Sequence, residues 1–193
     1  MKYSFAFATL LFLLLYCKKP PVEEPATAQP DTKDTVAAVV FRDSFQMLYN
    51  YQPWNPETIR ANKVKGKYGS YCSFASLRKV SRSIKEHFFI SDIPLVKGVY
   101  QVERIVRAAD INNGIPQSYL QYIVDEDQGI ASYWIDTTRT DHYVEVLSID
   151  TVKWNIMEGR FKVFMKLRSL APGSINFPDT IACTEGYFKI QLK

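Results

Sequence analysis

The segment RFKVFMKLR, Arg160–Arg168, places basic and apolar residues at alternating positions for most of its length. In an extended strand, successive side chains point to opposite faces, so this period of two predicts a strand with one face in a core and the other in water. The segment HYVEVLSID, His142–Asp150, has the same period and is rich in strand-forming residues. Both segments therefore predict β-structure.

The same pattern recurs from Phe41 to the end of the chain, and turn-forming residues separate the segments that carry it. These segments are FRDSFQMLY (41–49), YCSFASLRKV (71–80), SIKEHFFI (83–90), GVYQVERIV (98–106), SYLQYIVDE (118–126), IASYWID (130–136) and GYFKIQLK (186–193). A short helix fits only residues 56–65 and 77–86. We therefore expect an all-β fold, either a single antiparallel β-sandwich or a barrel, of about eight to ten strands.

The first sixteen residues have the features of an export signal. Lys2 precedes a run from Phe5 to Leu15 in which only Thr9 is polar. This run matches the roughly 7–15 apolar residues of a signal-peptide core and is shorter than the ~20 residues of a membrane-spanning helix. We therefore assign residues 1–16 to a signal peptide and exclude them from the fold.

The stretch LLYC, residues 14–17, resembles a bacterial lipobox, in which a leucine stands three residues before an obligatory cysteine. Tyr16 departs from this pattern, because a small residue usually precedes the cysteine. The resemblance implies that Cys17 begins the mature chain and carries a covalent lipid that anchors it to the membrane. A membrane-proximal cysteine within an uncleaved or conventionally cleaved signal is the alternative.

Residues 17–35 follow as a tether, since KKPPVEEPATAQPDTKDT has almost no large apolar residue and cannot form a core. The remaining residues, 36–193, have a length that fits one β domain. The residue directly after the cysteine is Lys18, and in this the chain resembles lipoproteins that are sent on to the outer membrane. We therefore expect a lipid-anchored protein at the bacterial outer membrane or cell surface.

Several segments resemble one family. YNYQPWN, SDIPLVKGVYQV, YVEVLSIDT, MEGRFKVFM and TEGYFKIQL look like those of uncharacterised small outer-membrane lipoproteins of Gram-negative bacteria. The resemblance implies a lipocalin-like barrel or an immunoglobulin-like β domain. It also suggests that Gly159–Phe161 forms a hairpin that enters a strand. It implies no activity.

Charge and aromatic content narrow the class of ligand. The net charge of +4 is a mild surplus, and the basic residues alternate with apolar ones, so we expect no nucleic-acid partner. Aromatic residues make up 14% of the chain, and such side chains near turns bind glycans or apolar small molecules. Tyr51, Trp54 and Trp154 are the candidates, with core packing as the alternative. We expect Trp54 to be exposed in a turn, and Trp134 to lie in the core.

Cys72 and Cys183 could form a disulfide bond, since such bonds persist in the periplasm and at cell surfaces. The alternative is that both are buried free thiols. The sequence contains no CxxC motif. We therefore expect no cofactor beyond the covalent lipid on Cys17.

The sequence offers little sign of catalysis, since it contains neither a GxSxG motif nor a glycine-rich phosphate loop. His142 lies near Asp136, Asp141 and Glu145, so a surface hydrolase is one alternative. Asp141, His142 and Glu145 are also weak candidates for a metal site, although turns use the same residue types. We favour a non-catalytic binding or accessory domain, with a structural subunit of an envelope complex as a further alternative.

Overall fold

Strands form all the regular secondary structure of the described residues. The computed structural model describes residues 42–104, 114–124, 128–153, 155–174 and 176–193. The signal peptide at 1–16, Cys17, the tether to residue 35 and Trp154 lie outside these ranges. Val39–Lys193 form one compact unit.

Eleven strands are present within the described residues, slightly more than the sequence predicts. They are β1 Ser44–Tyr49, β2 Gln52–Trp54, β3 Thr58–Gly66, β4 Gly69–Lys79, β5 Ile84–Pro94, β6 Gly98–Gln101, β7 Gln117–Val124, β8 Gln128–Ile135, β9 Tyr143–Asp150, β10 Ile156–Leu170 and β11 Thr180–Gln191. The prediction of an all-β fold is confirmed. The two segments that could have held a helix, 56–65 and 77–86, instead contribute to β3 and to the β4–β5 hairpin.

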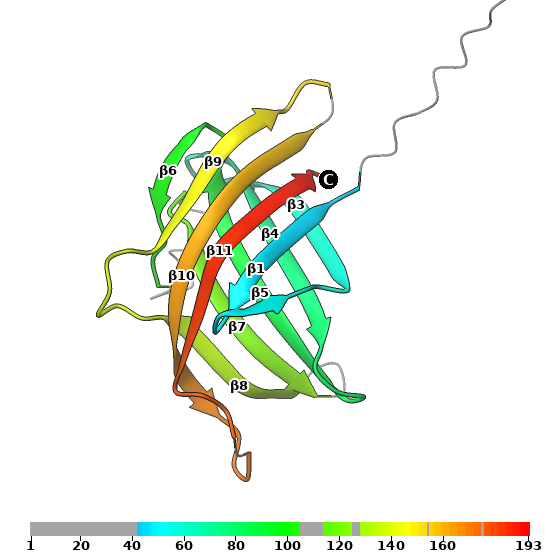
Figure 1. Ribbon diagram of the computed structural model, residues 1–193. Coiled ribbons are helices and arrows are strands. Elements are labelled where there is room, and N and C mark those ends of the chain that lie inside the picture. The colour runs from blue at the N-terminus through cyan, green and yellow to red at the C-terminus, as the bar shows by residue number, and fades with distance from the viewer. Residues whose placement is uncertain (1–41, 105–113, 125–127, 154, 175) are drawn as a thin grey trace, which may run out of the picture. The chain divides into compact units, whose positions relative to one another are not determined.

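The strands form a single sheet in the order β2-β1-β11-β10-β8-β7-β5-β4-β3, with antiparallel neighbours. β10 is the longest strand and changes partner along its length (Figure 1). Its first half pairs with β9, and its last residues pair with β8. β9 in turn pairs with β6, so the sheet branches at β10.

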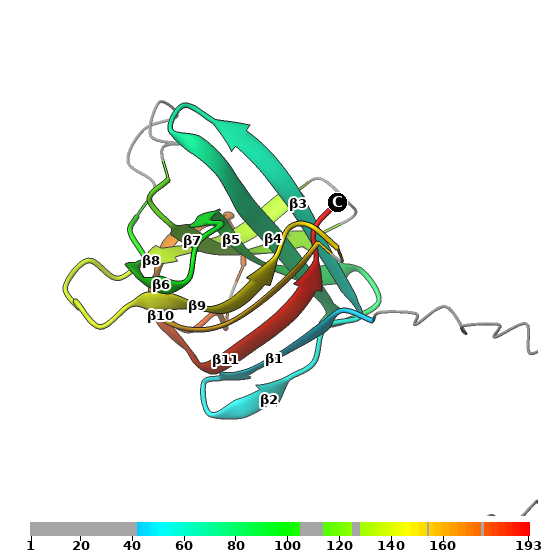
Figure 2. The same ribbon diagram turned by 90° about the horizontal axis from the view of Figure 1, so that it is seen from above.

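The sheet curls into an open, barrel-like form (Figure 2). β3 stands at one end of the strand order, yet the Lys63 N–H donates to the Lys193 carbonyl over 3.0 Å. This contact brings β3 to the end of the chain that follows β11, which lies near the opposite end of the order. The curl gives the sheet an inner face that side chains can fill.

β10 and β11 meet through two reciprocal pairs of glycine and phenylalanine. Gly159 faces Phe188, and Phe161 faces Gly186. A Cβ atom at either glycine would collide with the ring of its partner, so only glycine leaves space for the rings to lie across the sheet. Gly159 is therefore inside a strand, and the hairpin that the sequence suggested at 159–161 is wrong.

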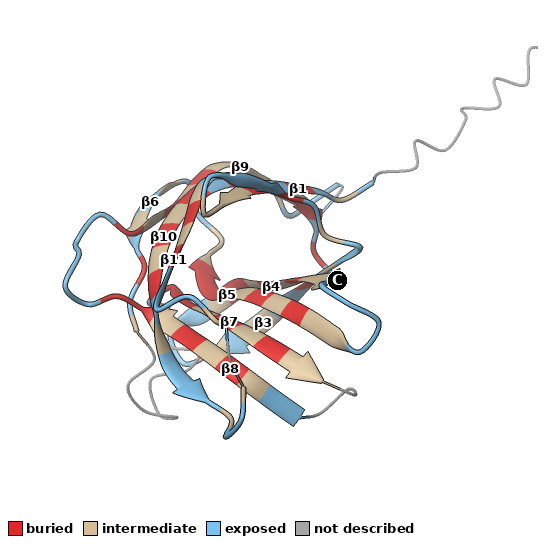
Figure 3. Cartoon of the chain, turned by 60° about the horizontal axis from the view of Figure 1, so that its bottom comes forward, coloured by how far each residue is buried: buried red, intermediate tan, exposed pale blue. Residues whose placement is uncertain are grey.

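Aromatic rings fill the inner face. The centroids of Phe45 and Phe161 are 5.5 Å apart, those of Phe88 and Phe161 are 5.2 Å apart, and those of Phe74 and Phe188 are 4.9 Å apart. Buried and partly exposed residues alternate along the strands (Figure 3), as the period of two in the sequence predicts. Among the described residues, the inner face of the sheet is therefore a packed core.

Cys72 and Cys183 are both buried free thiols, so the structure lacks the disulfide bond that the sequence allowed. The two residues lie on β4 and β11, which are not neighbours. Burial and, after it, the charge of Glu86 raise the pKa of Cys183 above its ordinary value, and Glu86 pairs with Arg78 on β4. Cys72 is six residues from Arg78 along the same strand, or roughly 20 Å. Burial raises the pKa of Cys72 to about 12.

Candidate functional site

Trp54 is fully buried, so the prediction that it lies in an exposed turn is wrong. β2 pairs with β1 and places Trp54 opposite Met47, which turns the indole into the core. Its ring contacts that of Phe45, and its Nε1–H donates to Glu86 Oε2 over 2.6 Å. Trp54 is therefore a structural residue and leaves the set of ligand-binding candidates.

Glu86 holds a cluster of polar and aromatic groups inside the sheet. Its Oε2 atom accepts from Arg78 Nε over 2.9 Å, while Oε1 is buried with no hydrogen-bond partner in the described chain. The hydroxyls of Tyr49 and Tyr122 are 2.7 Å apart. Burial, together with the charge of Glu86, raises the pKa of both tyrosines far above the ordinary value. This cluster, which we call the Glu86 cluster, also includes Trp54.

Tyr51 is 75% exposed and lies in the turn between β1 and β2. Asn50 and Tyr51 both have positive φ angles, as a tight hairpin turn requires. The Asn50 side chain accepts from the Ala182 N–H over 2.8 Å, which fixes the turn against β11. A hollow of about 270 Å³ separates this turn from Asp136 and Arg139 of the β8–β9 loop. Tyr51 thus remains a candidate ligand-binding residue at the edge of that loop.

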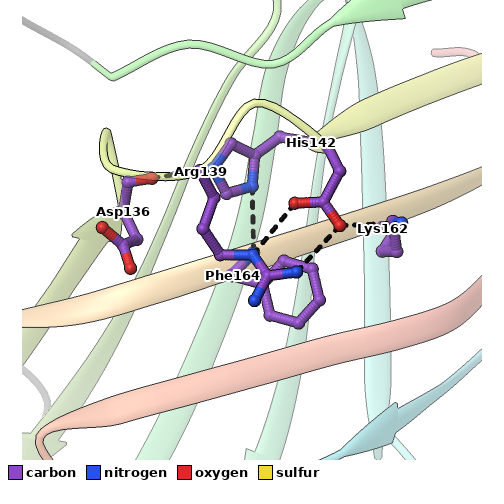
Figure 4. A network of polar contacts seen from close by, with 6 residues as sticks. Asp136, Arg139, His142, Lys162 and Phe164 are labelled. Carbon is purple, nitrogen blue, oxygen red and sulfur yellow. Dashed lines mark hydrogen bonds and ion pairs between the residues drawn. The ribbon is translucent and has the colours of Figure 1, made fainter.

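The β8–β9 loop, residues 136–142, is held in place by His142 (Figure 4). His142 is buried, and its Nδ1 accepts from the Phe164 N–H over 3.2 Å. Nε2 must therefore carry the proton, and it donates to the Asp136 carbonyl over 2.9 Å. The imidazole, at the end of the loop, therefore binds the start of the loop through the Asp136 carbonyl and binds β10 through the Phe164 N–H.

The charged side chains of the loop bind each other. Arg139 donates through Nε and Nη2 to the two oxygens of Asp141, each over 2.9 Å, and Lys162 donates to the same carboxylate over 3.0 Å. These bonds hold the pKa of Asp141 well below its usual range. The Arg139 guanidinium also lies 3.6 Å from the centre of the Phe164 ring. This arrangement, which we call the Asp141 network, fixes the outer side of the loop.

Asp136 lies at the start of the loop. Burial of its carboxyl group opposes ionisation, but hydrogen bonds from Thr138 and the contact with Lys166 outweigh that effect, so its pKa is lowered. The Lys166 Nζ lies 3.2 Å from Asp136 Oδ1. Asp136 is therefore ionised and paired.

These contacts argue against the two chemical hypotheses for His142, a metal site and a hydrolase. Both of its ring nitrogens are taken by backbone groups, so His142 has no nitrogen free for a metal ion or a substrate. Asp141 is held by two cations. Glu145 is on β9, where it faces Arg160 and Val99 on the neighbouring strands. Within the described ranges, no group of three histidine, cysteine or acidic residues could hold a metal ion.

A pocket of about 620 Å³ opens between the β8–β9 loop and the segment that follows β6. Val102 and Ile135 give it an apolar floor, and both are buried. Its polar lining comes from Gln101, Glu103, Arg104, Thr137, Arg139, Thr140 and His142. We call this the loop pocket. Its size lies within the roughly 300–1,000 Å³ of small-molecule sites.

A second hollow of about 210 Å³ adjoins the loop pocket, with which it shares Arg104, Ile135 and Thr137. Trp134 lines it and is half-buried on the outer face of β8, so the expectation that Trp134 is a core residue is wrong. Its neighbour Tyr133 occupies the core instead. The Arg104 guanidinium lies 4.8 Å from the centre of the Trp134 ring, and that of Arg168 lies 5.4 Å from it.

Sequence reasoning missed Arg104, Arg139 and Thr140 as pocket residues. TTRTD, residues 137–141, has the composition of an ordinary turn, and Arg104 sits within an alternating segment that predicts a strand. The one available signal was the density of basic residues on RFKVFMKLR, which indicated an exposed face. That face forms one wall of the second hollow through Lys166 and Arg168.

Comparisons with protein-family models, curated proteins and solved structures found no match to this chain. In the described ranges, no helix has the length and apolar character needed to span a membrane. The class that fold and site define is therefore an all-β domain with a pocket at one loop.

Proposed function

We propose that this chain is a lipid-anchored protein of the bacterial outer membrane or cell surface whose β domain is a non-catalytic binding module. Its ligand, a glycan or an apolar small molecule, occupies the loop pocket. The observation that carries the proposal is the pocket itself, in which polar side chains surround an apolar floor. The apolar run followed by LLYC supports the lipid anchor at Cys17.

The packed core supports a site on the outside of the sheet. A barrel that carries a ligand in its interior must leave space there, but the rings of Phe45, Phe88 and Phe161 lie against each other. The loop pocket, in contrast, is framed by a loop whose shape is fixed by His142. A site whose shape is set in advance loses less entropy when its ligand binds.

The same contacts favour binding over hydrolysis. A general base needs a ring nitrogen or a carboxylate within reach of the substrate, and those of the β8–β9 loop are committed to other partners. Glu103, which lines the pocket from the segment after β6, would have to act without them. His142 bonds only to backbone, while Asp136 and Asp141 each face a lysine. These groups position the loop and leave the recognition to its exposed side chains.

The pocket is tested by filling it. Thr140 is exposed and lines the loop pocket, so Thr140→Trp should block the pocket without disturbing the core. Thr151, exposed in the β9–β10 turn, provides the matched control Thr151→Trp. Monosaccharides and small apolar fragments would be screened against the purified full-length chain by ligand-observed NMR. We expect hits that Thr140→Trp abolishes and Thr151→Trp retains. Hits that survive Thr140→Trp unchanged would refute the proposed site.

The anchor is tested by removing the thiol. Cys17→Ser should release the chain into the soluble fraction and abolish incorporation of a labelled fatty acid. Cys72→Ser, which alters a buried thiol of the β domain, provides the control and should retain the label. A wild-type chain that takes up no label would refute the anchor and leave the pocket proposal standing.

A further inference from the structure

The charges around the two adjoining hollows are unbalanced. The residues that line the loop pocket and the second hollow include four basic side chains, Arg104, Arg139, Lys166 and Arg168, and two acidic ones, Glu103 and Asp136. Arg139 and Lys166 are neutralised by the carboxylates of the loop. In the part of the chain that the structure describes, neither Arg104 nor Arg168 forms an ion pair with a carboxylate.

Trp134 holds both of these arginines beside the hollows. A guanidinium that stacks on an aromatic ring keeps its N–H groups directed outward in the plane, where they can bind an acceptor. The Arg104 Nε is buried and has no hydrogen-bond partner in the described chain. A buried donor without a partner is costly. Because Nε is closed to solvent, a ligand in the hollow would bind the terminal N–H groups of this guanidinium.

The surrounding groups define the remainder of the ligand. Thr137 and Thr140 are exposed and offer hydroxyls, Gln101 offers an amide, and the buried Val102 and Ile135 form the apolar base of the pocket. Hydroxyls and amides recognise the hydroxyls of a sugar, and the apolar floor suits the C–H face of its ring. Arginine binds carboxylate and phosphate through parallel hydrogen bonds.

We propose that the two hollows together bind an anionic sugar, whose carboxylate or phosphate contacts Arg104 and Arg168 while its ring lies over Val102 and Ile135. This inference rests on the proposed function and adds the charge of the ligand to it. Glu103 lies at the same pocket and opposes an anion. Removal of the Glu103 charge therefore tests whether the ligand is an anion.

The test compares three probes that share one ring, namely glucuronate, glucose 6-phosphate and glucose, titrated into the full-length chain by NMR and calorimetry. We expect at least one of the charged probes to bind at least about tenfold more tightly than glucose, because a hydrogen bond between charged groups is stronger than a neutral one. The stronger of the two identifies carboxylate or phosphate as the preferred group. Added salt should weaken the charged probes alone.

Variants locate the contact. Arg104→Gln and Arg168→Gln should each weaken the charged probes about tenfold. Arg160→Gln, on the same outer face of β10 but away from both hollows, should change nothing. Glu103→Gln should strengthen binding, because it removes a like charge.

Three outcomes would overturn the inference: no binding of either charged probe, equal binding of glucose, or equal losses in Arg104→Gln and Arg160→Gln. If neutral ligands still bind and Thr140→Trp still blocks them, the binding function stands and only the anionic class is wrong. If no ligand of any charge is blocked by Thr140→Trp, the proposed function itself fails.

Discussion

The Glu86 cluster and the Asp141 network use similar chemistry in opposite surroundings. Each contains a carboxylate bound by an arginine that also lies over an aromatic ring, Trp54 for Arg78 and Phe164 for Arg139. Glu86 is fully buried, whereas the Asp141 side chain is 41% exposed. The two regions therefore separate the effect of burial from the effect of the bonding pattern.

Burial decides how much each carboxylate contributes to stability. In water, a charged group that loses its partner is hydrated again, so the ion pair contributes little. Inside the sheet no water is available to replace the partner, and an isolated charge is expensive. We therefore expect the Glu86 cluster to govern unfolding and the Asp141 network to govern the shape of the loop pocket.

The largest effect is expected for Trp54→Ala. It removes a fully buried ring and the bond to Glu86, so the free energy of unfolding should fall by about 3–5 kcal/mol. Denaturant titration measures this loss. Trp54→Phe keeps an aromatic ring and should lose clearly less. A small loss in Trp54→Ala would indicate that Trp54 is exposed. The Glu86 cluster could then not serve as the buried region in the comparison with the Asp141 network.

Glu86→Gln should come next, with a loss of about 2 kcal/mol. This is below the roughly 3–5 kcal/mol for a fully buried pair, because Arg78 is 29% exposed and can be hydrated in part. In a double-mutant cycle with Arg78→Met, the combined loss should be smaller than the sum of the single losses. Additive losses would show that the two charges do not interact.

His142→Phe should cost about 1–3 kcal/mol, because it leaves the Phe164 N–H without its acceptor. The Asp136 carbonyl loses the imidazole but keeps the Arg139 N–H as a donor. Hydrogen exchange of the Phe164 amide should accelerate, which reports the loop directly. Tyr143→Phe, at the neighbouring position, is the control and should leave that amide protected. An unchanged exchange rate in His142→Phe would contradict the role of the imidazole as the link to β10.

Asp141→Asn should have the smallest effect, and the effect should depend on pH. The pKa of Asp141 is lowered in the folded chain, so its contribution to stability is present above its unfolded pKa of about 4 and is lost as the pH falls below that value. Melting curves of the wild type and Asp141→Asn should therefore differ at neutral pH and converge in acid. High salt should reduce the difference. A difference that is independent of pH and salt would mean that packing, and not charge, is responsible.

The candidate site combines residues that the sequence placed correctly with residues whose proximity it could not predict. TTRTD was correctly assigned to a turn, and the basic residues of β10 were correctly placed on an outer face. The sequence could not show that β8, β10 and the segment after β6 bring Arg104, Trp134 and Arg168 to one place, because these residues are far apart in the chain. Trp54 was misplaced for a related reason: Pro53 and Asn55 are turn formers, but pairing with β1 holds the segment as a strand.

The sequence by itself determined the all-β class and the inner face of most strands. Both follow from a local rule, since side chains alternate between the two faces of any extended strand. The tertiary structure alone decided which strands are neighbours, how β10 divides its pairing between β9 and β8, and which charges are buried. These features depend on contacts between distant residues, such as the glycine–phenylalanine pairs of β10 and β11 and the bond from Trp54 to Glu86. A local pattern assigns a residue to the core or the surface, whereas its partner is set only when the whole sheet closes around the core.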